Sequence, residues 1–98
     1  MDTEKFAEDL GSDLVMVDFY ADWCGPCRTL GPIIERISEE KNVRLLKVDA
    51  DGNKDLASHF NVRGIPAVIF FKDKQEVDRV VGLKQPNVYT ETIEKHLS

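Results

Sequence analysis

The sequence of 98 residues is poor in cysteine and has no long apolar run. Its 2 cysteines are too few for a secreted domain stapled by disulfides, which at this size usually carries about four or more. The longest purely apolar stretch, residues 67–71, has the length of a strand and falls far short of the roughly 20 residues of a membrane-spanning helix. These absences argue against a disulfide scaffold and against a transmembrane segment.

Basic residues are in the minority. With 13 Lys and Arg against 18 Asp and Glu, the net charge is -5, which opposes sequence-independent binding to nucleic acid phosphates or anionic lipid. The N-terminal stretch, residues 1–10, is acidic and has no apolar run, unlike a secretory signal or a basic transit peptide. We therefore expect a cytoplasmic protein with no nucleic acid or membrane partner, folded as a single domain over residues 1–98.

Hydrophobic periodicity predicts an alternation of helices and strands. Helices are expected at residues 2–10, from 24 or 25 to 41, at 56–60 and at 87–97, and strands at 14–20, 43–49, 67–72 and 77–81. The order strand, helix, strand over 14–49 predicts two parallel strands with a right-handed crossover, and the last two strands form a hairpin around a polar turn at 73–76. The sequence therefore predicts an α/β fold in which helices cover both faces of a sheet.

Both cysteines lie in one short motif, Cys24-Gly25-Pro26-Cys27, where the first strand gives way to the long helix. Unpaired backbone N–H groups and the helix dipole stabilise a thiolate at a helix N-terminus, which lowers the pKa of the more N-terminal cysteine. Cys24 is therefore the expected nucleophile and Cys27 the resolving thiol. Pro26 fits the first helical turn and stiffens the geometry of the pair.

Two other interpretations of the cysteine pair have to be weighed. A purely structural disulfide that closes so short a loop contributes only about 2 kcal/mol, the low end of the range for disulfides. A closed zinc site needs two further ligands, and the only histidines, His59 and His96, lie on different predicted helices far apart in the sequence. A reversible dithiol with no metal is the favoured interpretation.

The motif Trp23-Cys24-Gly25-Pro26-Cys27 resembles the active site of the thioredoxin family. Further positions match that family in order along the chain, namely Asp18, Pro32, Lys47, Gly64-Ile65-Pro66 and Gly82. The resemblance implies a thioredoxin fold and an enzyme that reduces disulfides in target proteins. It also implies a monomer that binds no cofactor, receives electrons from NADPH through a flavin-containing thioredoxin reductase, and acts on targets such as peroxiredoxins or reductases.

Asp18 and Lys47 are the polar exceptions in two strands that otherwise favour burial. Burial should raise the pKa of the Asp18 carboxyl, and a nearby Lys47 should oppose that rise. The resemblance implies that Asp18 sits behind Cys27 and exchanges its proton. The alternatives are a solvated aspartate at a strand end and an edge lysine whose ammonium reaches solvent.

The resemblance also implies a substrate-binding rim formed by Trp23, Gly64, Ile65, Pro66 and Gly82. From the residues alone, Pro66 is either a strand-start proline or the second residue of a cis turn, and Trp23 could pack in the core. The family has the cis bond, which leaves the backbone before the proline free to pair with an extended target. Gly82 would let a target backbone approach closely.

Two rival functions remain open at this point. A disulfide isomerase-like domain typically carries a histidine between the cysteines, and Gly25 and Pro26 stand there instead. A redox-responsive docking module would use the same fold for binding without turnover.

The sequence also departs from the family pattern. The first predicted helix, with Asp2 or Thr3 as its cap, begins almost at the start of the sequence, so we expect a mixed sheet of about four strands that lacks the first strand of the family. The hairpin turn has no glycine and should need a longer loop or a left-handed residue such as Asp73 or Lys74. Tyr20 replaces the commoner tryptophan and Ala67 the commoner threonine, so packing and hydrogen bonding near the site should differ.

Overall fold

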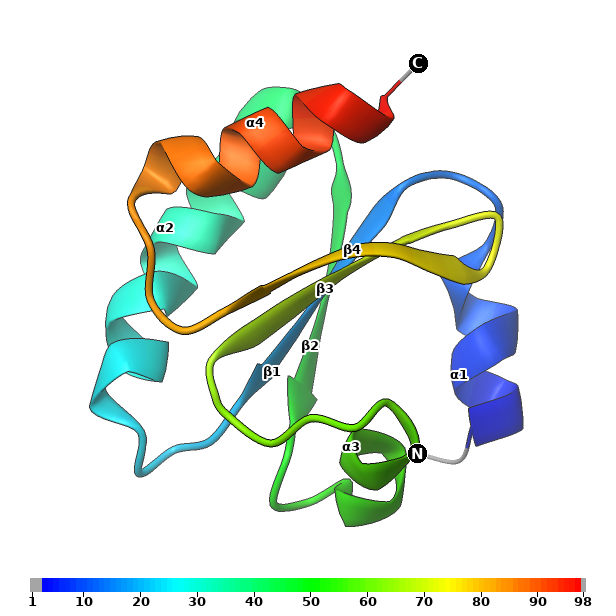
Figure 1. Ribbon diagram of the computed structural model, residues 1–98, viewed down its shortest axis with the longest axis vertical. Helices are drawn as coiled ribbons and strands as arrows, with labels where there is room; N and C mark the ends of the chain where they lie inside the picture. Colours follow the sequence, from blue (N-terminus) through cyan, green and yellow to red (C-terminus); the bar gives the residue numbers. More distant parts are fainter. Residues whose placement is uncertain (1–2, 98) are drawn as a thin grey trace.

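The computed structural model describes residues 3–97, which form four helices and four strands (Figure 1). In chain order these are α1 (Thr3–Leu10), β1 (Val15–Tyr20), α2 (Gly25–Lys41), β2 (Arg44–Asp49), α3 (Lys54–His59), β3 (Ala67–Lys72), β4 (Gln75–Val81) and α4 (Pro86–His96). Each predicted element is present in the predicted order. The predicted start of the first helix at residue 2 lies outside the described residues.

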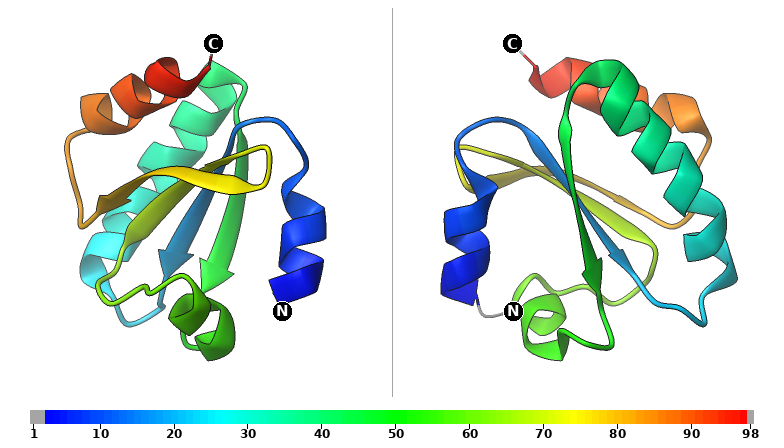
Figure 2. Two further views of the ribbon diagram at one scale, coloured as in Figure 1. Left: turned by 45° about the vertical axis from the view of Figure 1, so that its right-hand side comes forward. Right: turned by 180° about the vertical axis from the view of Figure 1, so that it is seen from behind.

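The four strands form one mixed sheet in the order β2-β1-β3-β4. β1 pairs with β2 in parallel, which confirms the predicted strand, helix, strand unit, and with β3 in the antiparallel sense. β3 and β4 form the predicted antiparallel hairpin. Helices α2 and α4 cover one face of this sheet and α1 and α3 the other (Figure 2). The predicted four-stranded mixed sheet between two helical layers is thus confirmed.

Alternation along β1 decides which layer each side chain joins. Val15, Val17 and Phe19 belong to the core under α1 and α3, whereas Met16 belongs to the core under α2 and α4. Asp18 has the same parity as Met16 and therefore points toward α2. A residue of the same strand with the opposite parity would face away from the helix that carries the cysteines.

The hairpin is tighter than predicted. β4 begins at Gln75 and not at residue 77, because the turn contains only Asp73 and Lys74 between the paired residues Lys72 and Gln75. Both turn residues have positive φ, 52° and 66°, the backbone of a two-residue turn whose twist matches that of the strands. The prediction of a left-handed residue at Asp73 or Lys74 is confirmed at both positions.

The helix ends near the site obey ordinary capping rules. α2 begins at Gly25, carries Pro26 in its first turn and ends at Lys41, as the sequence predicts, and its C-cap residue Asn42 has a left-handed φ of 55°. The last helix begins one residue earlier than predicted, at Pro86, because proline is well suited to a first helical position. It ends at His96, one residue short of the predicted Leu97.

Candidate active site

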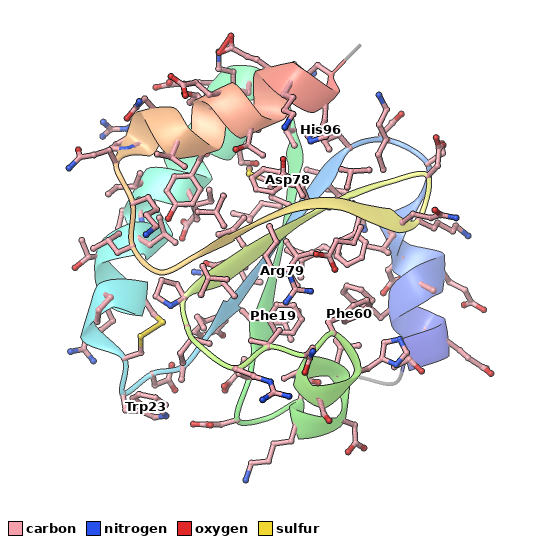
Figure 3. All side chains as sticks on the ribbon, in the orientation of Figure 1. Phe19, Trp23, Phe60, Asp78, Arg79 and His96 are labelled. Atoms are coloured by element: carbon pink, nitrogen blue, oxygen red, sulfur yellow. A yellow bond between two sulfur atoms is a disulfide. The ribbon has the colours of Figure 1, made fainter. Side chains whose placement is uncertain are left out.

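The cysteine pair occupies the N-terminus of α2, immediately beyond the C-terminal end of β1. Cys24 is the N-cap residue, and its Sγ accepts a hydrogen bond from the Cys27 N–H at 3.2 Å. The two cysteines form a disulfide with a Cα–Cα distance of 5.2 Å, seen as the yellow bond in Figure 3, and each is 5% exposed. The sulfur of Cys24 is thus placed where helix N–H groups stabilise negative charge.

The loop before β3 lies against the cysteine pair. The Ile65–Pro66 peptide is cis, and the Ile65 carbonyl oxygen is 3.9 Å from the Cys24 Sγ. Gly82 donates its N–H to the Pro66 carbonyl at 2.8 Å and has a φ of 88°, which favours glycine. Gly64 is exposed, and a Cβ added to it would meet Val81 at 3.4 Å. The structure therefore brings Cys24 together with Ile65, Pro66 and Gly82.

Trp23 lies on the surface beside the disulfide, as the labelled ring in Figure 3 shows. It is 68% exposed, which excludes core packing, and its Nε1–H donates to Asp51 Oδ2 at 2.7 Å. A groove of about 440 Å³ runs from Trp23 past Asp51 to Arg63 and Ile65. Sequence reasoning missed Asp51. The available signal was its position just after β2, because the carboxyl ends of parallel strands meet at one sheet edge.

Asp18 is buried behind this surface. Its side chain is on the α2 face of β1, the residue is 1% exposed, and among the described residues its Oδ1 has no hydrogen-bond partner. Burial raises the pKa of its carboxyl from the ordinary 3.8 to about 6, while the positive charge of Lys47 opposes the rise and the negative charge of Glu35 adds to it. The predicted direction for Asp18, and the predicted opposition by Lys47, are both confirmed.

A crevice of about 250 Å³ connects Asp18 with Cys27. Asp18, Cys27, Lys47, Glu35 and Tyr20 all line it. Lys47 is partly exposed and pairs with Asp18 in the parallel register of β1 and β2. Its Nζ forms an ion pair with Glu35 Oε2 at 3.1 Å and lies 5.3 Å from the centre of the Tyr20 ring.

Glu35 is a second residue that sequence reasoning missed. Its signal was spacing: Cys27, Gly31 and Glu35 recur every four residues and so share one side of α2. The small Gly31 lies between the other two. Because Gly31 has no side chain, it leaves room for the Glu35 carboxylate and the Lys47 ammonium. A Cβ added at Gly31 would lie 3.8 Å from each of them.

The two histidines lie away from the cysteines. The ring of His59 contacts Phe60 edge-on, and His96 Nε2 is 3.0 Å from Asp78 Oδ2 at the end of α4. Within residues 3–97 no three His, Cys, Asp or Glu side chains are grouped so that they could hold a metal ion. None of the helices in the same range is long and apolar enough to cross a membrane.

A disulfide at a helix N-terminus, backed by a buried carboxyl and placed on a mixed sheet between two helical layers, defines the class of thiol–disulfide oxidoreductases. Comparison with known proteins gives the family. The thioredoxin family model matches residues 1–95. Thioredoxin from Chlamydia trachomatis serovar D is 45% identical over 94 residues, covering 95% of this chain and 92% of that protein. Thioredoxin from Chlamydia pneumoniae is 46% identical over 95 residues, covering 96% and 93%.

Solved structures agree with the sequence comparison. A mutant thioredoxin from Halobacterium salinarum NRC-1 superimposes with a TM-score of 0.90 at 39% identity, covering 100% of this chain and 87% of that one. The chain belongs to the thioredoxin family. It is a thiol–disulfide oxidoreductase, and the dithiol of Cys24 and Cys27 supports disulfide reductase activity.

Proposed function

We propose that the chain reduces disulfides in target proteins with Cys24 as the attacking thiolate and Cys27 as the resolving thiol. The observation that carries this assignment is the position of Cys24 as N-cap of α2, with its sulfur accepting the Cys27 N–H. Cys27 lies one turn inside the helix and faces the crevice that contains Asp18. The two sulfurs therefore have different environments, and only Cys24 has the helix terminus to stabilise its thiolate in the absence of a base.

The reaction transfers two electrons from the dithiol to the target. The Cys24 thiolate attacks one sulfur of the target disulfide, an intermolecular disulfide forms, and the other target sulfur leaves as a thiolate. Cys27, once deprotonated, attacks the Cys24 sulfur. The second target sulfur then leaves as a thiolate that takes up a proton, and Cys24 and Cys27 are joined in the oxidised form.

Asp18 is the proposed acceptor of the Cys27 proton. In the mixed disulfide, Cys27 has no helix N-terminus of its own, and its thiol needs a base in a place with poor access to solvent. A carboxyl with a pKa of about 6 on the same crevice is ionised near neutral pH and still able to take a proton. Lys47 has the proposed role of stabilising the ionised form of Asp18.

The target is proposed to bind at the rim formed by Trp23, Gly64, Ile65, Pro66 and Gly82. Ile65 offers backbone groups next to Cys24, so an extended target segment can pair with it as a short added strand. The indole of Trp23 provides apolar contact area on one side. Gly82, on the other side, presents no side chain to hinder the approach.

Electrons are proposed to come from NADPH through a flavin-containing thioredoxin reductase. The proposed location is the cytoplasm, and the chain is proposed to act as a single-domain monomer over residues 1–98.

Peroxiredoxins are among the proposed targets. One observation on a relative supports them. A chain from a study of the thiol resolving mechanism in yeast mitochondrial 1-Cys peroxiredoxin via glutathione/thioredoxin systems superimposes with a TM-score of 0.88 at 27% identity, covering 96% of this chain and 90% of that one.

A trapping experiment tests the assignment of the two cysteines. The Cys27→Ser variant should attack a disulfide-bonded protein and remain attached to it through Cys24, as a mixed disulfide detectable by mass spectrometry without reductant. The Cys24→Ser variant, with Cys27 intact, should trap little or none, because Cys27 faces the crevice with Asp18 and is not the N-cap of α2. Equal trapping by the two variants would contradict the assignment.

A further inference from the structure

The crevice that contains Asp18 also contains an ion pair that none of the proposed steps uses. Glu35 Oε2 is 3.1 Å from Lys47 Nζ, and the two residues, from α2 and β2, both line the crevice. Their side chains are 54% and 41% exposed, so the pair lies at the mouth of the crevice, while Asp18 lies at its buried end. Lys47 therefore stands between a buried and an exposed carboxylate.

The surroundings of Lys47 restrict where its ammonium can go. Its Nζ lies over the Tyr20 ring at 5.3 Å, and its strand position is opposite Asp18 in the register of β1 and β2. Glu35 is the acidic side chain with which it forms an ion pair. An ammonium held by Glu35 is less available to an ionised Asp18, because one charge at the end of one flexible chain cannot contact both carboxylates closely.

Other charged and titratable groups also face Asp18. Those that line the crevice come from four segments: Tyr20 from β1, Asp22 from the loop after it, Cys27, Arg28 and Glu35 from α2, and Lys47 from β2. On the α4 side, burial raises the pKa of the Tyr89 hydroxyl, and the negative charge of Asp18 adds to that rise. Arg28 Nη1 is engaged with the Asp22 carbonyl at 2.7 Å, which leaves Lys47 as the cation that acts on Asp18.

We propose that Glu35 is a positioning residue for the resolving step: it holds the Lys47 ammonium at the mouth of the crevice and so sets the pH range in which Asp18 accepts the proton of Cys27. The proposal rests on the proposed role of Asp18. The effects of the two charges on Asp18 support this proposal, because the charge of Lys47 lowers the pKa of Asp18 and the charge of Glu35 raises it. Loss of Glu35 removes a negative charge and frees an ammonium, and both changes favour ionised Asp18.

The first measurement follows the Asp18 carboxyl itself. In the disulfide form the cysteines do not titrate, so carbon-13 NMR of the aspartate side chains reports Asp18 without interference from them. Glu35→Gln should move the Asp18 midpoint to lower pH by roughly half a unit or more, the size expected from one charge near a partly exposed site. The matched control is Glu39→Gln, the same change one turn further along α2 at an exposed position outside the crevice, which should leave the midpoint unchanged.

A double substitution separates positioning from the charge of Glu35 alone. Lys47→Met should raise the Asp18 midpoint, because the favourable cation is lost. In the Lys47→Met background, Glu35→Gln should shift the midpoint less than in the wild type, since there is no ammonium to release. An equal shift in both backgrounds would overturn the proposal, because Glu35 would then act only through its own charge. An unchanged Asp18 midpoint in Glu35→Gln would also overturn it.

The second measurement connects this titration with the resolving step. Reduced protein mixed with excess 5,5′-dithiobis(2-nitrobenzoate) should release thionitrobenzoate in two phases, the first from attack by Cys24 and the second from attack by Cys27. The acid limb of the second phase should move to lower pH in Glu35→Gln and stay in place in Glu39→Gln. If the Asp18 midpoint shifts but the rate of the second phase has the same pH profile in every variant, Asp18 does not accept the proton of Cys27. That result would overturn the proposal as well. Trapping by Cys27→Ser still tests the reductase function independently.

Discussion

Replacement of Asp18 by asparagine should stabilise the oxidised protein, by an amount that depends on pH. The carboxyl is 1% exposed and its pKa rises from 3.8 to about 6 on burial. Above the pKa of the folded state, the folded protein must hold a desolvated charge, whereas the unfolded chain holds a hydrated one. Asparagine has nearly the shape of the protonated carboxyl and never carries that charge.

The size of the effect follows from linkage. A rise of about two units at roughly 1.4 kcal/mol per unit is a penalty of about 3 kcal/mol once Asp18 is ionised in both states. The sign of the pH dependence follows from which state binds the proton between the pKa of the unfolded chain and the pKa of the folded protein. From about pH 4 to about pH 6 the folded state binds a proton that the unfolded state has released, so this contribution to stability falls as pH rises. Below about pH 4 both states are protonated and the penalty is absent.

The assay is denaturant unfolding of the disulfide forms of wild type and Asp18→Asn over this pH range. The two proteins should have similar free energies of unfolding near pH 4, and the variant should be more stable by about 3 kcal/mol near pH 8. Asp13→Asn, at an exposed position on the α1–β1 loop, is the matched control and should show no such divergence. A difference between wild type and Asp18→Asn that stays constant with pH, or a variant less stable than wild type near pH 8, would refute the reasoning.

Three further substitutions test the support around the site. Tyr89→Phe should lower the free energy of unfolding by about 1 kcal/mol, because the hydroxyl donates to the Gly82 carbonyl at 3.1 Å and accepts from the Lys84 N–H at 3.2 Å; denaturant unfolding measures this. Gly82→Ala should lower the melting temperature, with a cost of about 1 kcal/mol, since φ is 88° there; calorimetry showing no loss would argue against that backbone strain. Trp23→Phe should raise KM for a protein disulfide several-fold through loss of the 2.7 Å bond to Asp51, with the rate toward a small aromatic disulfide unchanged.

Much of the fold was predictable because the strongest signals are local. The apolar stretch at β3 and the one at β1, interrupted only by Asp18, indicate strands buried on both faces, and the apolar spacing of Leu30, Ile34 and Ile37 indicates the long helix. The start of β4 was not predicted, because Gln75 and Glu76 are polar and resemble turn residues. They are exposed members of an edge strand, where polarity carries no cost.

A site residue could be predicted where its type is unusual for its place in the sequence. It could not be predicted where its role depends on contact with a residue of another element. Asp18 stands out as a carboxylate in a buried strand, and its raised pKa follows from burial alone. Glu35 and Asp51 do not stand out, because acidic residues on a helix surface and after a strand are ordinary. Their partners, Lys47 and Trp23, come from other elements, and only the folded chain shows the contacts.

In the proposed mechanism, Cys24 carries the catalytic reduction of protein disulfides. The most direct test is the rate at which catalytic amounts of the chain accelerate reduction of insulin disulfides when dithiothreitol supplies the electrons, compared between wild type and Cys24→Ser. The wild type should clearly accelerate the reaction over the uncatalysed rate, and Cys24→Ser should not, with both proteins folded. A wild type that does not accelerate the reaction, or a Cys24→Ser variant that accelerates it equally, would contradict the account.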